Sequence, residues 1–220
     1  MGILKEYVSP LHQSTTRDCL ARMVDNKVKC MTISKRYDKH YWDGDRKYGY
    51  GGYRYIADRW KPVAESLIKD YNLVKGSRIL DVGCGKGFLL YEMLRIEPGL
   101  KITGIDKSEY AIENSHKEVK KFLKSGLAQD LSEFDNESFD LLISLGTLHN
   151  LKIFDLEITL KQINRISKQS YIMVESYRNN QELFNLQCWA LTAETFFDTS
   201  EWKWFFDKCD YDGDYEFIFF

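Results

Sequence analysis

One stretch sets the architecture of this chain: Arg78-Ile79-Leu80-Asp81-Val82-Gly83-Cys84-Gly85-Lys86-Gly87-Phe88-Leu89-Leu90. It reads as an apolar strand with an acid near its end, then three glycines at alternate positions, then an apolar helix. Because glycines carry no side chain, the backbone there can turn tightly and lie against a ligand. The first turn of the following helix offers free N–H groups to polar ligand atoms. The stretch therefore predicts a loop that binds a nucleotide-like cofactor.

The spacing of these glycines argues against two common phosphate-binding loops. The dinucleotide sequence G-x-G-x-x-G would need its third glycine at position 88, which is Phe88. Nothing in the chain matches the phosphate loop G-x-x-x-x-G-K-[ST]. Asp81, the acid before the first glycine, would repel a diphosphate and favours a ligand with a cationic amine.

The run Leu80–Gly87 closely resembles the first motif of class I S-adenosylmethionine-dependent methyltransferases. The resemblance covers about residues 60–177 and implies S-adenosylmethionine as cofactor and S-adenosylhomocysteine as product. It also implies a Rossmann-like α/β fold, doubly wound around a mostly parallel sheet. Members of that family usually have seven strands, whereas six are expected here, so we expect a shortened C-terminal sheet edge.

Hydrophobic periodicity places strands and helices in alternation after residue 57, as in a parallel, doubly wound sheet. Strands are expected at 78–83, 101–106, 127–129, 139–145, 171–175 and 215–220. Helices are expected at about 60–71, 88–96, 108–124 and 154–166, followed by a helical insertion at about 181–208. We expect one domain over 1–220, which comprises an aromatic-rich N-terminal lid or cap (1–57), a cofactor-binding core (58–177), and the insertion and last strand (178–220).

The composition narrows the class of partner. A formal net charge of −2 argues against binding along a nucleic-acid backbone, so we expect no nucleic-acid partner. The five cysteines are scattered without a CxxC pair, which suggests neither a disulfide framework nor a metal site. Because no apolar leader or membrane-length apolar run is present, we expect a cytoplasmic protein without membrane contact. A homodimer remains open.

The cofactor-binding residues are expected at the carboxyl ends of the strands. Asp106 closes the second strand and can accept two hydrogen bonds from a ribose diol; its alternative role is a helix N-cap, which Ser108 could also supply. By resemblance to the family, Asp130 accepts a hydrogen bond from the adenine amino group and Leu131 lies near the ring, unless Asp130 is an ordinary loop acid. The expected set is Asp81, Gly83, Cys84, Gly85, Gly87, Asp106, Lys107, Gln129, Asp130, Leu131 and Ser144.

The chemistry requires alignment and, for some acceptors, a base. A methyl group on a sulfonium is already an electrophile, so the enzyme must chiefly align the acceptor with it. A hydroxyl acceptor also needs its proton removed. His149, just after the fourth strand, is the first candidate base, and its alternative role is packing or hydrogen bonding to substrate or backbone. His40 is the second candidate, while Glu175 and Arg178, after the fifth strand, are expected to orient the substrate.

Residues 46–55 interleave aromatic rings, glycines and cations. This segment could either close as a lid over the acceptor or pack its rings on the core. As a lid, it would place Tyr53 for stacking on a sugar or base, and Arg54 and Arg59 for pairing with phosphate.

These observations predict an S-adenosylmethionine-dependent methyltransferase that acts on a small polar acceptor. A sugar, a nucleotide sugar or a phosphorylated metabolite is expected, with O-methylation favoured over N-methylation and carbohydrate modification as the setting. Residues 144–147 lack the Asn/Asp-Pro-Pro-Tyr type of motif seen in enzymes that methylate amino groups of DNA bases or protein glutamine. The alternatives are a protein or RNA methyltransferase and a non-catalytic S-adenosylmethionine-binding protein.

Overall fold

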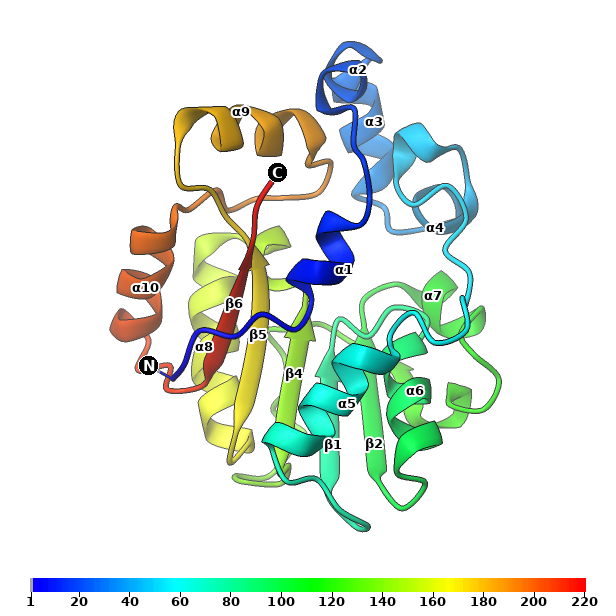
Figure 1. The fold of residues 1–220 in the computed structure, drawn as a ribbon, viewed down its shortest axis with the longest axis vertical. Coiled ribbons are helices and arrows are strands. Elements are labelled where there is room, and N and C mark those ends of the chain that lie inside the picture. The colour runs from blue at the N-terminus through cyan, green and yellow to red at the C-terminus, as the bar shows by residue number, and fades with distance from the viewer. Residues whose placement is uncertain (1) are drawn as a thin grey trace.

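The computed structural model describes residues 2–220 and contains one six-stranded sheet (Figure 1). All five strand pairings are parallel, and the strand order is β3-β2-β1-β4-β5-β6. The strands are β1 Arg78–Val82, β2 Lys101–Asp106, β3 Leu123–Ser125, β4 Leu141–Leu145, β5 Ser170–Glu175 and β6 Asp214–Ile218. The predicted doubly wound α/β fold is confirmed.

Helices cover both faces of the sheet because neighbouring residues of each strand point to opposite sides. The longer helices are α5 Lys61–Asp70, α6 Phe88–Ile96, α8 Ile153–Ile166, α9 Asn180–Trp189 and α10 Thr199–Lys208, with the short α7 Glu109–Glu113 after β2. In β1, Leu80 and Val82 pack with apolar side chains of α8 and α10, whereas Ile79 packs with those of α5 and α6. The core therefore consists of two apolar layers, one on each side of the sheet.

The strand order reverses between β1 and β4, which are neighbours although β2 and β3 separate them in the sequence. Asp81 of β1 lies in register with Gly104 of β2 and with Ile143 of β4. Doubly wound sheets bind their ligands at the carboxyl ends of the strands beside such a reversal. The topology therefore places the ligand crevice at the glycine loop that follows β1.

The third strand is the main error of the predicted element list. It forms at Leu123–Ser125 rather than at 127–129, and the helix expected over 108–124 shrinks to α7 and a single turn, η2 Lys120–Phe122. The reason is packing, since the Leu123 side chain is buried where it fills the space left by Gly87 and Gly104. Residues 127–129 are thereby released to line the crevice.

The C-terminal edge of the sheet is shortened, as predicted. β6 pairs directly with β5 and parallel to it, and no seventh strand lies between them within residues 2–220. Residues 2–5 run along the outer edge of β6, where Lys5 N–H donates to the Tyr215 carbonyl and Tyr215 N–H donates to the Ile3 carbonyl. The buried carboxylate of Glu216 then accepts the backbone N–H groups of residues 7–9 and the Tyr171 hydroxyl.

The N-terminal residues fold into short helices above the carboxyl ends of the strands (Figure 1). They are α1 Ser9–Gln13, α2 Cys19–Val24, α3 Lys27–Ser34, α4 Lys39–Asp43 and the turn η1 Arg46–Tyr48. We call residues 2–57 the cap; Met1, the first residue of the predicted lid, lies outside the described residues. α2 packs on α9, so the cap and the C-terminal insertion meet over the crevice. No helix in the described part of the chain combines the length and apolarity needed to cross a bilayer.

Candidate functional site

The glycine loop adopts a conformation that side chains resist. Gly83, Gly85 and Gly87 have φ values of +85°, +53° and +71°, in the left-handed region. A Cβ on Gly83 would collide with the Thr147 side chain, and one on Gly85 would lie 2.9 Å from the Trp42 ring. Glycine is therefore required at these positions for two reasons. The backbone has positive φ values, and Thr147, after β4, and Trp42, in the cap, lie too close to leave room for a side chain.

Asp106 fixes the glycine loop from the end of β2. Its Oδ2 accepts the Gly85 N–H and its Oδ1 accepts the Ser108 N–H, each at 2.8 Å. Burial raises the pKa of Asp106, while these two N–H groups oppose the rise. The N-cap of α7 is Ser108, whose Oγ accepts the Ala111 N–H. Asp106 is therefore not the N-cap residue.

Asp81 is the most unusual charged group at this end of the sheet. Its side chain is buried and accepts no hydrogen bond from any residue within 2–220. Burial and the nearby charge of Asp106 raise the pKa of Asp81 to about 8. The Asp81 oxygens are not among the fully buried side-chain atoms that lack a partner within residues 2–220, and Asp81 lines neither of the cavities described below. A ligand ammonium that reached this carboxyl would supply it with a partner. This observation fits the amino-acid end of S-adenosylmethionine.

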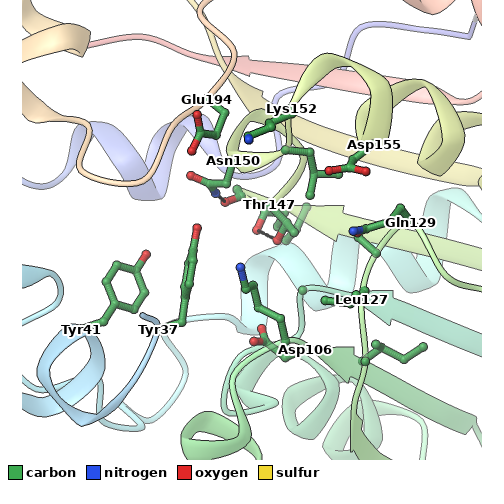
Figure 2. A pocket seen from close by; sticks show the side chains of 18 of the residues that line it. Tyr37, Tyr41, Asp106, Leu127, Gln129, Thr147, Asn150, Lys152, Asp155 and Glu194 are labelled. Atoms are coloured by element: carbon green, nitrogen blue, oxygen red, sulfur yellow. Dashed lines mark hydrogen bonds between the residues drawn. The ribbon is translucent and has the colours of Figure 1, made fainter. Parts of the chain in front are cut away.

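A first cavity of about 310 Å³ opens beside Asp106 (Figure 2). Leu127 and Gln129 line it from the core, and Tyr37 and Tyr41 line it from the cap. Asn150, just after β4, also lines it. Its Oδ1 is buried and has no hydrogen-bond partner within residues 2–220, although its Nδ2 donates to the Gly146 carbonyl. The cavity therefore has apolar walls and acceptor atoms that a ribose and a purine can use.

Five predicted cofactor residues line neither this cavity nor the second one described below: Asp81, Gly87, Asp130, Leu131 and Ser144. Asp130 is exposed and accepts a hydrogen bond from the Ser132 hydroxyl. Leu131 is fully buried in the core, and Ser144 is buried where its Oγ donates to the Val82 carbonyl and ties β4 to β1. The positions of Asp130 and Leu131 follow from the misplaced third strand, which shifts the crevice wall to residues 126–129. Ser144 is buried because it lies within β4. Asp155 of α8 supplies an acid at this cavity instead (Figure 2).

A second cavity, of about 560 Å³, lies on the other side of the glycine loop. The two cavities share one wall, made of Tyr41, Trp42, Tyr50, Gly83, Leu145, Gly146 and Asn150. The predicted residues Cys84, Tyr53, Arg54, Arg59, His149 and Glu175 line the second cavity, and Lys107 lines the first. A ligand on the glycine loop can therefore reach both cavities. Gly87 lines neither cavity and is the N-cap residue of α6.

The geometry of His149 does not suit a general base. His149 is 3% exposed, and its Nδ1 accepts the backbone N–H of Glu175 at 3.2 Å. Its Nε2 lies 3.4 Å from Glu175 Oε2, and burial lowers the pKa of His149, so the neutral ring carries its proton on Nε2. Neither nitrogen is free to take a proton from an acceptor. His149 instead positions the carboxylate of Glu175, which faces the cavity.

The structure gives two other predicted residues no place at the site. His40 is exposed on α4 and borders neither cavity. Arg178 pairs with Glu182 of α9 and stacks over the Phe219 ring, outside both cavities. The local sequence could not reveal these partners, since each depends on how the cap and the insertion fold.

The cap is fastened to the glycine loop by polar contacts. The Trp42 indole N–H donates to Ser108 Oγ at 2.8 Å. Lys86, buried within the loop, donates to both carboxylate oxygens of Asp43 at 2.7 and 2.8 Å, and the Tyr110 hydroxyl donates to the same carboxylate. In the aromatic segment, Tyr53 stacks on the Phe88 ring of α6, as the packing alternative requires, and Tyr50 and Tyr53 line the second cavity. The lid role stays a prediction.

A family comparison identifies a methyltransferase domain, while the names of the similar proteins differ in both reaction and substrate. A sequence profile described as a methyltransferase domain matches residues 73–209. The mouse (Mus musculus) protein named "Arginine-hydroxylase NDUFAF5, mitochondrial" is 29% identical over 140 residues, which cover 64% of this chain and 37% of that protein. A ubiquinone biosynthesis O-methyltransferase of Pelagibacter ubique is 27% identical over 157 residues, which cover 67% of this chain and 63% of that protein.

A ribosomal RNA small subunit methyltransferase C of Buchnera aphidicola is 29% identical over 143 residues, which cover 63% of this chain and 41% of that protein. The chain thus spans between 37% and 63% of the length of these three relatives. The crystal structure of a SAM-dependent methyltransferase from Archaeoglobus fulgidus matches with a TM-score of 0.53 at 22% identity, over 68% of each chain. The relatives named here therefore include two methyltransferases, one named for ubiquinone biosynthesis and one for ribosomal RNA, and one protein named for arginine hydroxylation.

Proposed function

Because this chain belongs to the class I S-adenosylmethionine-dependent methyltransferases, we propose that it methylates a small polar acceptor in the second cavity. One observation carries the proposal, namely that the two cavities meet at the glycine loop. A cofactor on that loop would have its nucleoside in the first cavity and its reactive end facing the second. The second cavity is large enough for a small molecule, and residues of the cap form part of its wall, which supports a metabolite as acceptor.

The residues of the first cavity would hold the cofactor. S-adenosylmethionine supplies an electrophilic methyl group when bound. Asp106 would accept the ribose hydroxyls, and Asn150 Oδ1 would gain the partner that it lacks. Leu127, Ala128 and Gln129 would line the adenine. Asp81, in β1 and outside the linings of both cavities, would pair with the ammonium group of the amino-acid end.

Glu175 would handle the acceptor's proton. Its carboxylate faces the second cavity and is held beside the buried ring of His149. A hydroxyl bound near it could lose its proton to the carboxylate while it is aligned with the methyl group. This arrangement favours O-methylation over N-methylation, because a neutral amine would need no such group.

The acceptor class proposed is a sugar, a nucleotide sugar or a phosphorylated metabolite. Two alternatives are kept because the relatives' names differ: an RNA or protein acceptor, and a protein that binds S-adenosylmethionine without transferring the methyl group. A cytoplasmic location and a homodimer remain proposals.

Calorimetry with S-adenosylmethionine, followed by mass spectrometry of S-adenosylhomocysteine formed with each acceptor, tests the proposal. We expect micromolar binding that Asp106→Asn weakens and Asp130→Asn, a matched exposed acid, leaves unchanged. Turnover with a sugar, nucleotide sugar or phosphorylated metabolite supports the proposal. Turnover only with RNA or protein, or binding without any turnover, would favour one of the alternatives instead.

A further inference from the structure

Five arginines line the second cavity: Arg17, Arg22, Arg46, Arg54 and Arg59. Within residues 2–220, the arginines that form ion pairs with carboxylates are Arg78, Arg95 and Arg178, none of which borders this cavity. Among the described residues that line it, Glu175 is the single acidic one. The cavity wall therefore carries a marked excess of positive charge, in a chain whose formal net charge is −2. We call these five residues the arginine cluster.

The inner part of the cluster is organised around one ring of the C-terminal insertion. The guanidinium carbons of Arg17, Arg22 and Arg46 lie 5.5, 4.0 and 5.1 Å from the centre of the Trp189 ring. Arg22 also donates to the carbonyls of Arg46, Gly49 and Trp189. Carbonyl oxygens and a ring orient the guanidinium groups but carry no net charge, so the positive charge stays uncompensated.

The pKa values of the inner arginines also indicate positive charge that lacks a counter-ion. Burial lowers the pKa of Arg17, Arg22 and Arg46, and for Arg22 the value falls to about 10. The positive charge of Arg46 contributes to the lowering at both Arg17 and Arg22. The guanidinium groups repel one another and have lost part of their hydration. A bound anion would offset both the repulsion and the cost of desolvation.

We propose that the arginine cluster binds an anionic group of the acceptor, of the phosphate or pyrophosphate class. Guanidinium groups are planar forks that match phosphate oxygens in pairs, and several of them suit a group with more than one negative charge. The proposal rests on the proposed function, since it assumes that the second cavity receives the acceptor. It selects the phosphorylated and nucleotide-linked acceptors over an uncharged sugar.

A second source of negative charge is the carboxylate of the cofactor itself, and the test separates the two. Inorganic pyrophosphate is titrated by calorimetry into protein saturated with S-adenosylhomocysteine. The double variant Arg54→Gln/Arg59→Gln should leave the fold unchanged, because both side chains are exposed and donate no hydrogen bond to residues 2–220. Arg46→Gln tests the inner part, and Arg36→Gln, an exposed cap arginine outside both cavities, is the matched control.

We expect the wild-type protein and Arg36→Gln to bind pyrophosphate alike, and the double variant and Arg46→Gln to bind it at least about tenfold more weakly. Affinity for S-adenosylhomocysteine should stay the same in all four proteins. The proposal is overturned if wild-type protein loaded with S-adenosylhomocysteine does not bind pyrophosphate, or if the cluster variants bind it as the wild type does.

The cofactor's carboxylate is recognised instead if the cluster variants lose affinity for S-adenosylhomocysteine but keep it for 5′-methylthioadenosine, which lacks that carboxylate. That result also overturns the proposal. If S-adenosylhomocysteine itself fails to bind the wild-type protein, the proposed function fails, whatever pyrophosphate does.

Discussion

Replacing Asp81 by Asn should abolish most of the pH dependence of S-adenosylmethionine binding. Asp81 has no hydrogen-bond partner within residues 2–220, and burial together with the charge of Asp106 raises its pKa to about 8. In the ligand-free protein the carboxyl is therefore mostly protonated at neutral pH. Pairing with the ligand ammonium requires the ionised form, so binding must release a proton below pH 8.

The size of the effect follows from that pKa. With a pKa of about 8, roughly one Asp81 carboxyl in a hundred is ionised at about pH 6, and roughly half at about pH 8. The free energy of binding should therefore improve by about 1.4 kcal/mol per pH unit over this range, before the ligand amine itself begins to lose its proton near pH 8. The affinity of the wild-type protein should rise roughly 20- to 50-fold between about pH 6 and about pH 8.

Calorimetry at about pH 6, 7 and 8, in buffers of different ionisation enthalpy, measures both the affinity and the proton released. Asp81→Asn should bind S-adenosylmethionine more weakly at about pH 8 and with little slope, while Asp130→Asn, an exposed acid, should keep the wild-type profile. 5′-Methylthioadenosine, which has no ammonium group, should bind both proteins without the rise. A wild-type profile that is flat from about pH 6 to 8, or an equal slope in Asp81→Asn, would refute the assignment of Asp81 to the ammonium.

Three further predictions concern the loop, the acceptor and the sheet edge. Gly85→Ala should weaken cofactor binding and lower the melting temperature, because the added Cβ would lie 2.9 Å from the Trp42 ring. The control is Gly76→Ala, at a glycine that also has a positive φ but no atom within 4 Å of an added Cβ; it should lower only the melting temperature. Glu175→Gln should lower kcat about 10²- to 10⁴-fold without changing the calorimetric affinity for the cofactor, and an unchanged kcat would exclude it as proton acceptor. Glu216→Gln should lower the free energy of unfolding in urea by roughly 1.5–3 kcal/mol, because the buried carboxylate accepts three backbone N–H groups; a loss below the error of the measurement would contradict this.

The sequence was informative wherever local pattern and ligand chemistry coincide. The strand that carries Asp81, the glycine loop and Asp106 at the end of β2 all lie where the pattern predicts. Each is specified within a few residues, by an apolar run or by the φ values that only glycine adopts easily. Leu123 shows the limit of this reasoning: it becomes a strand residue because its side chain fills the space beside Gly87, which no local pattern reveals.

Residues of the cap were the hardest to place, and the reason is the sequence distance to their partners. The backbone N–H of Val8 binds the carboxylate of Glu216, and the Trp42 indole binds Ser108. The cap helices are short and have little apolar periodicity of their own, so these distant contacts determine where they lie. Once β6 holds residues 2–9, the chain must pass over the carboxyl ends of the strands, and the arginines that follow are brought to the second cavity. The contacts of residues 7–9 with Glu216 therefore help to place the cap, and with it the arginines that line the second cavity.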